Sequence, residues 1–189
     1  VYIDSTRNYD YASAEVFPFL SNARDQGRCR FIGVTGNQAD DVGKALASSK
    51  LDTVLVAFNL DLIWRRARTQ VLPTARKTGT AMILAAVLQN ARLATVRRDW
   101  LEAPPDWMNE PIRERFRRLY DIQEDCGIHL VELGLRFALG EPGVSTILVG
   151  AARPEEIEQS VAAVEAGPLP AALHQALEEI GLEEPHPFF

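Results

Sequence analysis

One stretch decides the fold class: Ser145-Thr-Ile-Leu-Val-Gly150-Ala-Ala-Arg-Pro-Glu-Glu-Ile-Glu-Gln-Ser160. Residues 146–149 form a β-branched and aliphatic run, typical of a strand buried between helices on both sides of a parallel sheet. Pro154 suits the first helical turn, and the two glutamates after it complement the positive end of a helix dipole. The stretch therefore predicts a buried strand, a glycine turn and a helix.

The turn inside this stretch has the features of an anion-binding site. It aims backbone N–H groups, with Arg153 beside them, at the carboxyl end of a parallel strand, a place that receives phosphate groups well. An ordinary strand–helix junction has the same local features. The choice between the two interpretations therefore depends on the rest of the chain.

Length and composition indicate a globular protein. The 189 residues can bury one core, so we expect residues 1–189 to form a single domain or a large part of a bigger one. A hydrophobic content of 47% and a charged fraction of 24% are those of soluble proteins. The net charge of −6 is spread over both halves, which argues against a nucleic-acid or anionic-lipid partner.

The sequence also predicts a location and the absence of a metal site. It has no apolar run of the roughly 18 residues that a membrane span needs, and its first residues do not read as a signal peptide. Cys29 and Cys126 are isolated, so a disulfide framework or a zinc site is not expected. We therefore expect a cytoplasmic protein without a metal and without a membrane partner.

Strands and helices alternate along the whole chain. The predicted strands are residues 1–3, 29–34, 53–59, 81–87 and 145–149. The predicted helices are residues 14–26, 40–48, 61–78 with a break at Pro73, 111–125, 130–139 and 170–180, in addition to the helix that opens at Pro154. This alternation implies an α/β fold with a parallel sheet, and it fits a (β/α)8 barrel. A complete barrel needs eight strands and about 250 residues, so this one is incomplete.

Four segments together resemble a known family: Phe17-Pro-Phe-Leu20, Gln26-Gly-Arg-Cys-Arg-Phe-Ile-Gly-Val-Thr-Gly36, Pro104-Pro-Asp-Trp107, and the stretch from Thr146 to Ala163. Through them, residues 10–182 resemble the C-terminal half of the aldo-keto reductases, particularly the branch that oxidises free sugars such as L-galactose, L-fucose and D-threo-aldoses. The resemblance implies a TIM barrel of the aldo-keto reductase type, here lacking part of its N-terminal half. It also implies NAD(P)-dependent hydride transfer between nicotinamide and a carbonyl or aldose substrate.

The first residues are similar to a different part of the same family. Asp4-Ser-Thr-Arg-Asn-Tyr9 resembles the motif after the family's second strand, which implies that Tyr9 is the general acid or base and Asp4 its electrostatic support. The chemistry is sound, because a phenol with a pKa of about 10 is a poor acid at neutral pH until a cation stabilises its phenolate. The family's catalytic Lys and His are not recognisable between Tyr9 and Asp10.

Three explanations for this junction stay open. The sequence omits segments of a longer protein, it is a truncated or spliced product, or residues 1–9 are the fourth strand with Asp4 in the place of the catalytic His. The function has a matching alternative. If the tetrad is incomplete, the chain is a catalytically inactive barrel remnant that binds a nucleotide or a partner protein.

The resemblance places the nicotinamide end of the cofactor beside three residues. Thr35 lies where the family's Ser or Thr holds the carboxamide, and Gly36 replaces the usual Asn, so that Asn37 is the other candidate donor. On a neighbouring strand the usual Gln falls near Leu55, and Asn59 offers a polar group instead. A simple cap or turn role is the alternative for these residues.

The resemblance places the rest of the cofactor along two turns. Leu88, Gln89 and Asn90 occupy the turn under the pyrophosphate, where backbone N–H groups matter more than side chains. The adenosine end is assigned to Gly150, Ala151, Ala152, Arg153, Glu156, Gln159 and Ser160. Arg153 favours NADP because it can meet a 2′-phosphate, whereas two carboxylates would repel one, so both NAD and NADP remain open.

The long loop of residues 88–109 contains two tryptophans. Trp100 and Trp107 are candidates to line a sugar pocket by stacking on the apolar face of the substrate. The alternative is that they hold the loop against the rim of the barrel. A loop of this length is itself a candidate binding element.

Overall fold

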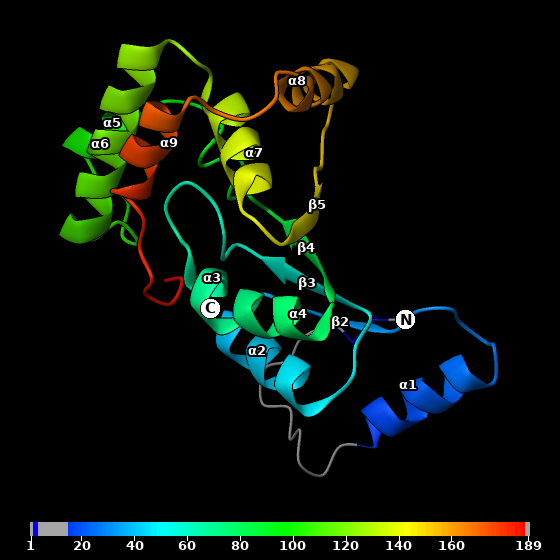
Figure 1. Ribbon diagram of the computed structural model, residues 1–189. Coiled ribbons are helices and arrows are strands. Elements are labelled where there is room, and N and C mark those ends of the chain that lie inside the picture. Colours follow the sequence, from blue (N-terminus) through cyan, green and yellow to red (C-terminus); the bar gives the residue numbers. More distant parts are fainter. Residues whose placement is uncertain (1, 4–14, 188–189) are drawn as a thin grey trace.

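The computed structural model describes residues 2–3 and 15–187, which form a parallel sheet with helices packed against it (Figure 1). Within these residues each strand pairs in parallel with the next along the chain. The strands are β1 (Tyr2–Ile3), β2 (Gly33–Gly36), β3 (Thr53–Ala57), β4 (Ala81–Ala85) and β5 (Val144–Leu148). Sequential parallel strands joined by helices are the arrangement of an open part of a (β/α)8 barrel, as the sequence predicts.

The helices follow the predicted order. They are α1 (Val16–Asp25), α2 (Ala39–Ser48), α3 (Arg66–Gln70), α4 (Leu72–Thr78), α5 (Asp99–Glu102), α6 (Glu110–Cys126), α7 (Leu130–Gly140), α8 (Pro154–Glu165) and α9 (Ala171–Glu178). The short helix α5 lies inside the stretch predicted as one long loop. In the part of the chain that the structure describes, none of these helices is long and apolar enough to cross a membrane.

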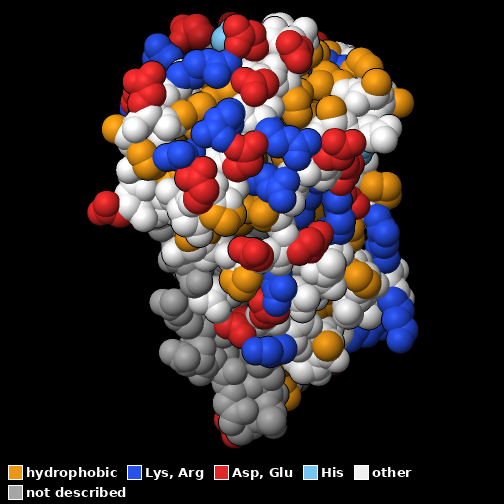
Figure 2. All heavy atoms as spheres, turned by 90° about the vertical axis from the view of Figure 1, so that its left-hand side faces the viewer, with side chains coloured by type: hydrophobic (Ala, Val, Ile, Leu, Met, Phe, Trp, Pro, Cys, Tyr) orange, Lys and Arg blue, Asp and Glu red, His pale blue; other side chains and the backbone are white. Residues whose placement is uncertain are grey.

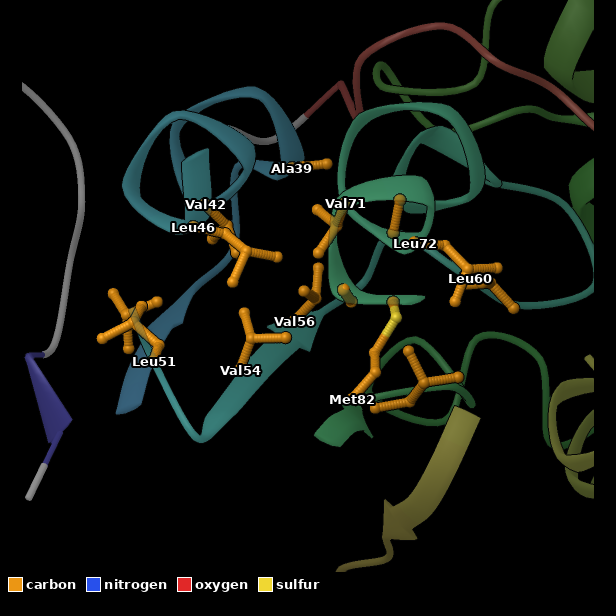
Figure 3. Packing of buried hydrophobic residues seen from close by; sticks show 14 of the residues in the cluster. Ala39, Val42, Leu46, Leu51, Val54, Val56, Leu60, Val71, Leu72 and Met82 are labelled. Atoms are coloured by element: carbon orange, nitrogen blue, oxygen red, sulfur yellow. The ribbon is translucent and has the colours of Figure 1, made fainter. Parts of the chain in front are cut away.

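The main core lies on one face of the sheet. Val54 and Val56 of β3 are 0% and 1% exposed and belong to the same cluster of buried side chains as Val42 of α2 and Leu72 of α4 (Figure 3). The residues between them along β3 are only half-buried. The strands therefore alternate, because one face packs on helices and the other faces the open side of the incomplete barrel.

A row of paired residues on that open face crosses four strands. Thr35, Leu55, Ile83 and Thr146 are neighbours in register across β2 to β5. The first three of these side chains are half-buried and the last is exposed. In a closed barrel the same row would point into the packed interior.

The strand predicted within residues 145–160 differs from its prediction. β5 is not a buried strand, because among the described residues it pairs only with β4 and is therefore an edge. Thr146 is exposed, and Leu148 is 51% exposed. The β-branched run predicts burial on both sides, but among the described residues it forms a strand with one free edge. A local sequence pattern does not show whether a neighbouring strand is present.

Two element boundaries also differ from the prediction. The strand expected at residues 29–34 begins only at Gly33, because the N–H of Ile32 donates to the carboxylate of Asp52 rather than to a neighbouring strand. The helix expected from residue 61 begins at Arg66. Before it, the Asp61 carboxylate accepts the N–H groups of the two residues that follow Leu62, at 2.8 and 3.0 Å, and so forms a turn.

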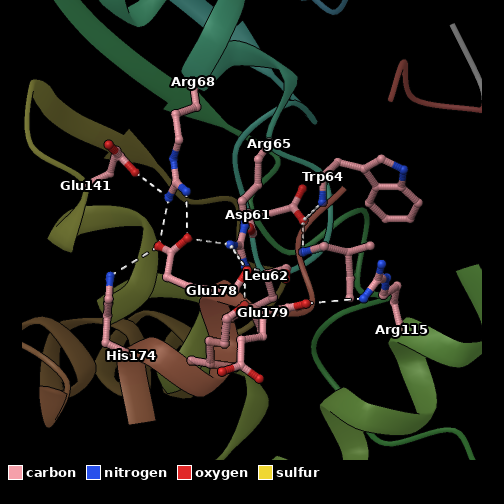
Figure 4. A network of polar contacts seen from close by, with 12 residues as sticks. Asp61, Leu62, Trp64, Arg65, Arg68, Arg115, Glu141, His174, Glu178 and Glu179 are labelled. Carbon is pink, nitrogen blue, oxygen red and sulfur yellow. Dashed lines mark hydrogen bonds and ion pairs between the residues drawn. The ribbon is translucent and has the colours of Figure 1, made fainter. Parts of the chain in front are cut away.

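A buried arginine joins the loop after β3 to the C-terminal helix (Figure 4). Arg65 is 2% exposed, and its guanidinium donates to the carbonyl oxygens of Leu62 at 3.1 Å and Leu177 at 2.5 Å. It also forms an ion pair with Glu178 at 2.8 Å and lies 4.4 Å from the ring centroid of Phe137. Burial lowers the pKa of Arg65 to about 10, so the group stays protonated at neutral pH.

A glycine three residues beyond the end of α9 leaves room for this guanidinium. A Cβ atom at Gly181 would lie 2.7 Å from the Arg65 guanidinium carbon, which is closer than van der Waals contact allows. Glu178 accepts hydrogen bonds from Arg68 as well, at 2.7 and 2.9 Å, and Arg68 also pairs with Glu141 at 2.5 Å. The network therefore joins α3, α9 and the end of α7.

The face that carries α6 and α9 mixes both signs of charge (Figure 2). Arginine side chains there alternate with glutamate and aspartate side chains, as in the exposed pair of Arg117 with Glu114 on α6. Interspersed charges of this kind produce no single-sign patch on this face.

Replacing Arg65 with Ala should lower the free energy of unfolding by about 3–5 kcal/mol, because the carbonyl oxygens of Leu62 and Leu177 lose the buried charged donor that they accept from. Urea unfolding followed by circular dichroism measures this. The matched control is Arg117→Ala, which removes an exposed pair and should cost about 0–1 kcal/mol. Equal losses in the two variants would contradict the role assigned to Arg65.

Candidate active site

A cleft of about 450 Å³ opens at the carboxyl ends of β4 and β5, beside the start of α8. Its walls come from the turn after β4, the start of α7, the end of β5 and the first turns of α8. The lining residues are Ala86, Val87, Leu88, Asn90, Ala91, Ala94, Thr95, His129, Val131, Leu148, Val149, Gly150, Arg153, Glu156, Gln159 and Ser160. The carboxyl edge of a parallel sheet is where ligands bind in α/β folds.

Strained backbone marks the same edge. Among the described residues, the non-glycine residues with positive φ are Phe58, Ala86, Gln89, Asn90 and Ala91, with φ between 50° and 68°. The first follows β3 directly, and the other four lie in the turn after β4. Left-handed backbone is costly for residues with a Cβ and clusters at ligand sites, where the surrounding structure enforces it.

The turn of residues 88–91 presents two different surfaces. Asn90 and Ala91 line the cleft, and neither of their N–H groups takes part in the backbone hydrogen bonds of this turn. Gln89 instead is 0% exposed, and its side chain donates to Asp61 at 2.5 Å and to the Phe58 carbonyl at 3.1 Å. The backbone is therefore available to a ligand, whereas the Gln89 side chain is engaged in the interior.

At the start of α8, Arg153 pairs with one of the two glutamates of the first turn. Glu156 accepts the Ala152 N–H at 2.9 Å and the Arg153 Nε–H at 3.1 Å. The Ala152 N–H first, and then Arg153, hold the pKa of Glu156 below its ordinary value. The Glu156 carboxylate already accepts the N–H groups that a bound phosphate would accept. A phosphate there must therefore displace this carboxylate or bind against its negative charge.

The other residues that the resemblance assigns to the adenosine end of the cofactor differ in exposure. Gly150 lines the cleft, and a Cβ atom built on it would contact nothing within 4 Å, so the fold itself does not require glycine there. Gln159 is exposed at the cleft, and the buried Ser160 hydroxyl donates to the Glu156 carbonyl at 2.8 Å. Ala151 and Ala152 are exposed but are not among the lining residues.

The three residues expected at the nicotinamide lie away from this cleft. Thr35 is half-buried in the open-face row of β2. Asn37 and Asn59 line a second, smaller cavity of about 40 Å³, together with Pro185 and His186. The Asn59 amide donates to the carbonyl oxygens of Asn37 at 2.8 Å and of Ala57 at 2.7 Å, which is the turn role that the sequence left as the alternative.

The two tryptophans pack on each other. The ring centroids of Trp100 and Trp107 are 5.5 Å apart at 86°, and that of Trp107 is 5.9 Å from that of Phe116 on α6. The Arg97 guanidinium lies 4.6 Å from the Trp100 centroid. Neither tryptophan lines either cavity, so these contacts are those expected if the pair holds the long loop against α6.

Two predicted catalytic residues are not described by the structure, and two residues of the cleft are not predicted by the sequence. Asp4 and Tyr9 lie outside the described residues. Conversely, His129 and Val131 line the cleft from the start of α7 but carry no local signal of such a role. Only the packing of α7 against α8 brings them to the site.

This arrangement defines a class of protein. A parallel β/α sheet with a cleft at its carboxyl edge, a strained turn on one side and a helix start with an arginine on the other is a barrel-type fold with a candidate nucleotide site.

Comparison with known proteins gives the family. The sequence profile of the Aldo/keto reductase family matches residues 1–181, and the chain belongs to that family. The chain is 31% identical over 150 residues to pyridoxal 4-dehydrogenase of Microbacterium luteolum, covering 77% of this chain and 42% of that protein. It is 28% identical over 181 residues to D-threo-aldose 1-dehydrogenase of a Pseudomonas species, covering 92% and 53%. The chain thus spans about half the length of these relatives.

A solved structure agrees on the fold. The chain superimposes on an aldo-keto reductase from Bacillus halodurans in its apo form with a TM-score of 0.74, over 97% of this chain and 62% of that one, at 19% identity. The described sheet therefore corresponds to part of an aldo-keto reductase barrel, as the sequence predicts.

A buried histidine lines the smaller cavity. His186 is 4% exposed, and its Nε2 is 2.8 Å from the Gln89 Oε1 atom. Its ring centroid is 4.4 Å from that of Trp64. Burial, and then the charge of Arg92, lowers the pKa of His186 to about 4. The folded state therefore favours the neutral ring.

Stability should fall on acidification because of this histidine. The folded pKa of His186, about 4, lies below its ordinary value of 6.5, so the neutral ring stabilises the fold fully above pH 6.5 and loses that contribution as the pH falls toward 4. The loss is about 3 kcal/mol. Urea unfolding at pH 7, 5.5 and 4 should show a shallower loss in His186→Gln than in the wild type. The control is His129→Gln, an exposed position that should keep the wild-type slope.

Proposed function

We propose that residues 1–189 form one barrel domain of an NAD(P)-dependent oxidoreductase, which moves a hydride between nicotinamide and a carbonyl or aldose substrate. One observation carries the proposal: the cleft is lined by residues that the resemblance assigns to the cofactor. They are Leu88, Asn90, Gly150, Arg153, Glu156, Gln159 and Ser160. These positions are separated by some 60 residues of chain and meet only in the fold.

The cleft fits the pyrophosphate and adenosine part of a dinucleotide. Its volume of about 450 Å³ lies within the range of small-molecule sites, about 300–1,000 Å³. The turn of residues 88–91 leaves the N–H groups of Asn90 and Ala91 out of its own backbone hydrogen bonds, so that they can receive an anion, and Gly150 leaves space that the fold does not need. When bound there, the nicotinamide cofactor supplies the hydride donor or acceptor.

The substrate class is proposed from the relatives. One is a D-threo-aldose 1-dehydrogenase and another a pyridoxal 4-dehydrogenase, so both act on a carbonyl or its alcohol. Aldehydes and aldoses are therefore the substrates to test first.

The chain's own contribution to the chemistry is proton transfer. We assign this role to Tyr9, whose hydroxyl gives its proton to the carbonyl oxygen in the reducing direction and takes it from the alcohol in the oxidising direction. In the reducing direction the carbonyl carbon gains the hydride and the oxygen the proton, so the product is the alcohol and the cofactor leaves oxidised. Asp4 supports the tyrosine electrostatically.

Glu156 favours NAD over NADP in this proposal. Its carboxylate lies at the start of α8 and already engages Arg153 at 3.0 Å. A ribose 2′-hydroxyl can donate a hydrogen bond to such a carboxylate, whereas a 2′-phosphate brings a second anion against it. This outweighs the attraction of Arg153 for the phosphate, because the guanidinium already has an anionic partner.

Tyr9→Phe should abolish turnover of aldehydes and aldoses, by at least about a hundredfold, while leaving the dissociation constants of NAD and NADP unchanged. Steady-state kinetics and calorimetric titration measure the two quantities. Tyr11→Phe is the matched control and should keep wild-type turnover. Wild-type protein that binds the dinucleotide without turnover would instead support the nucleotide-binding alternative.

Glu156→Gln should strengthen NADP binding relative to NAD by about tenfold, because it removes the anion that opposes a 2′-phosphate. The measurement is titration of each cofactor at two salt concentrations. Glu158→Gln changes the same charge at an exposed position of α8 and should leave the ratio as it is. An unchanged ratio in Glu156→Gln would remove Glu156 from cofactor selection.

A further inference from the structure

The buried amide of Gln89 joins three segments that are distant in sequence. Its Nε2 donates to the Phe58 carbonyl and to Asp61, both in the loop after β3. Since that nitrogen faces two oxygens, the Oε1 atom faces His186, whose Nε2 is 2.8 Å away and must carry the proton. One side chain therefore ties the β3 loop, the turn after β4 and the chain after α9.

The turn to which Gln89 belongs is strained. Gln89, Asn90 and Ala91 have φ of 53°, 50° and 68° in succession. Such backbone persists only when its surroundings enforce it. The hydrogen bonds of the Gln89 amide are the contacts that do so on the buried side, and Asn90 and Ala91 present the same turn to the cleft.

Residues 182–187, which we call the C-terminal segment, lie against the loop after β3. The Leu182 N–H donates to the Ile63 carbonyl at 2.6 Å, and the Arg65 N–H donates to the Leu182 carbonyl at 2.8 Å. Further along, Pro185 and His186 form one wall of the small cavity at the ends of β2 and β3. The segment and the strained turn thus border different cavities and meet at Gln89.

We infer that Gln89 is a positioning residue that couples the cleft to the docking of the C-terminal segment, so that a dinucleotide on the turn tightens the segment and the docked segment strengthens dinucleotide binding. The inference rests on the proposed function for its ligand, a pyrophosphate-bearing dinucleotide. The coupling is reciprocal, because two linked equilibria must favour each other by the same factor.

The coupling can first be tested without a ligand, by hydrogen exchange and mass spectrometry. His186→Ala should raise the exchange rate of the backbone amides in residues 86–93 by about fivefold, because the turn loses one of its restraints. Glu184→Ala, an exposed change in the same segment, should leave them at the wild-type rate. Wild-type exchange of residues 86–93 in His186→Ala overturns the inference and leaves the proposed function intact.

The second test uses ADP-ribose, which has the pyrophosphate and adenosine but no nicotinamide. It should protect residues 182–187 from exchange in the wild type, and this protection should vanish in Gln89→Gly. The ADP-ribose dissociation constant should rise about tenfold in that variant. Glycine adopts the left-handed conformation of this position readily, so a weaker complex in Gln89→Gly does not report added backbone strain.

The outcomes separate the inference from the proposed function. Wild-type affinity and protection in Gln89→Gly overturn the coupling but not the cofactor site. If the wild type binds none of ADP-ribose, NAD and NADP, the proposed function is overturned, and so is the part of the inference that concerns dinucleotide binding. Circular dichroism shows whether Gln89→Gly is folded. If it is not, ADP-ribose affinity is measured instead in His186→Ala, which removes the same hydrogen bond from its other partner.

Discussion

The charge buried at Arg65 constrains how the loop after β3 and the end of α9 lie against each other. A guanidinium in the interior is tolerated only when acceptors surround it, and here they come from the loop after β3 and from the end of α9. The loop after β3 therefore cannot move without exposing or stranding a charge. Because Asp61 in the same loop accepts the Gln89 amide, this constraint extends to the turn at the cleft.

The carboxyl edge of the sheet shows how such rigidity is used. Among the described residues, the backbone there adopts left-handed conformations at five non-glycine positions, a cost that packing elsewhere must offset. On the buried side the Gln89 side chain is held by hydrogen bonds, and on the other side Asn90 and Ala91 line an open cleft. Rigid support behind an exposed turn is the arrangement that holds a ligand site in a fixed geometry.

The sequence predicts element order and type well. The alternation of strands and helices, and the Pro-Glu-Glu helix start, depend on local periodicity and dipole chemistry, and both are present in the structure. Burial of β5 is predicted wrongly, because an apolar run reads alike at the centre and at the edge of a sheet. The late start of α3 is missed for a similar reason, since the Asp61 turn competes with the helix through a side-chain hydrogen bond.

What the sequence by itself determined is the parallel α/β architecture, which follows from residue types at short range, and the family resemblance, from which the positions for a dinucleotide are a prediction. Only the tertiary structure decided which positions share a cleft: Asn90 and Arg153 meet there, whereas Asn59 turns to a backbone carbonyl and the Gln89 side chain to the interior. The reason is physical. A polar side chain bonds whichever partner the fold brings within about 3 Å, and no local pattern encodes that partner.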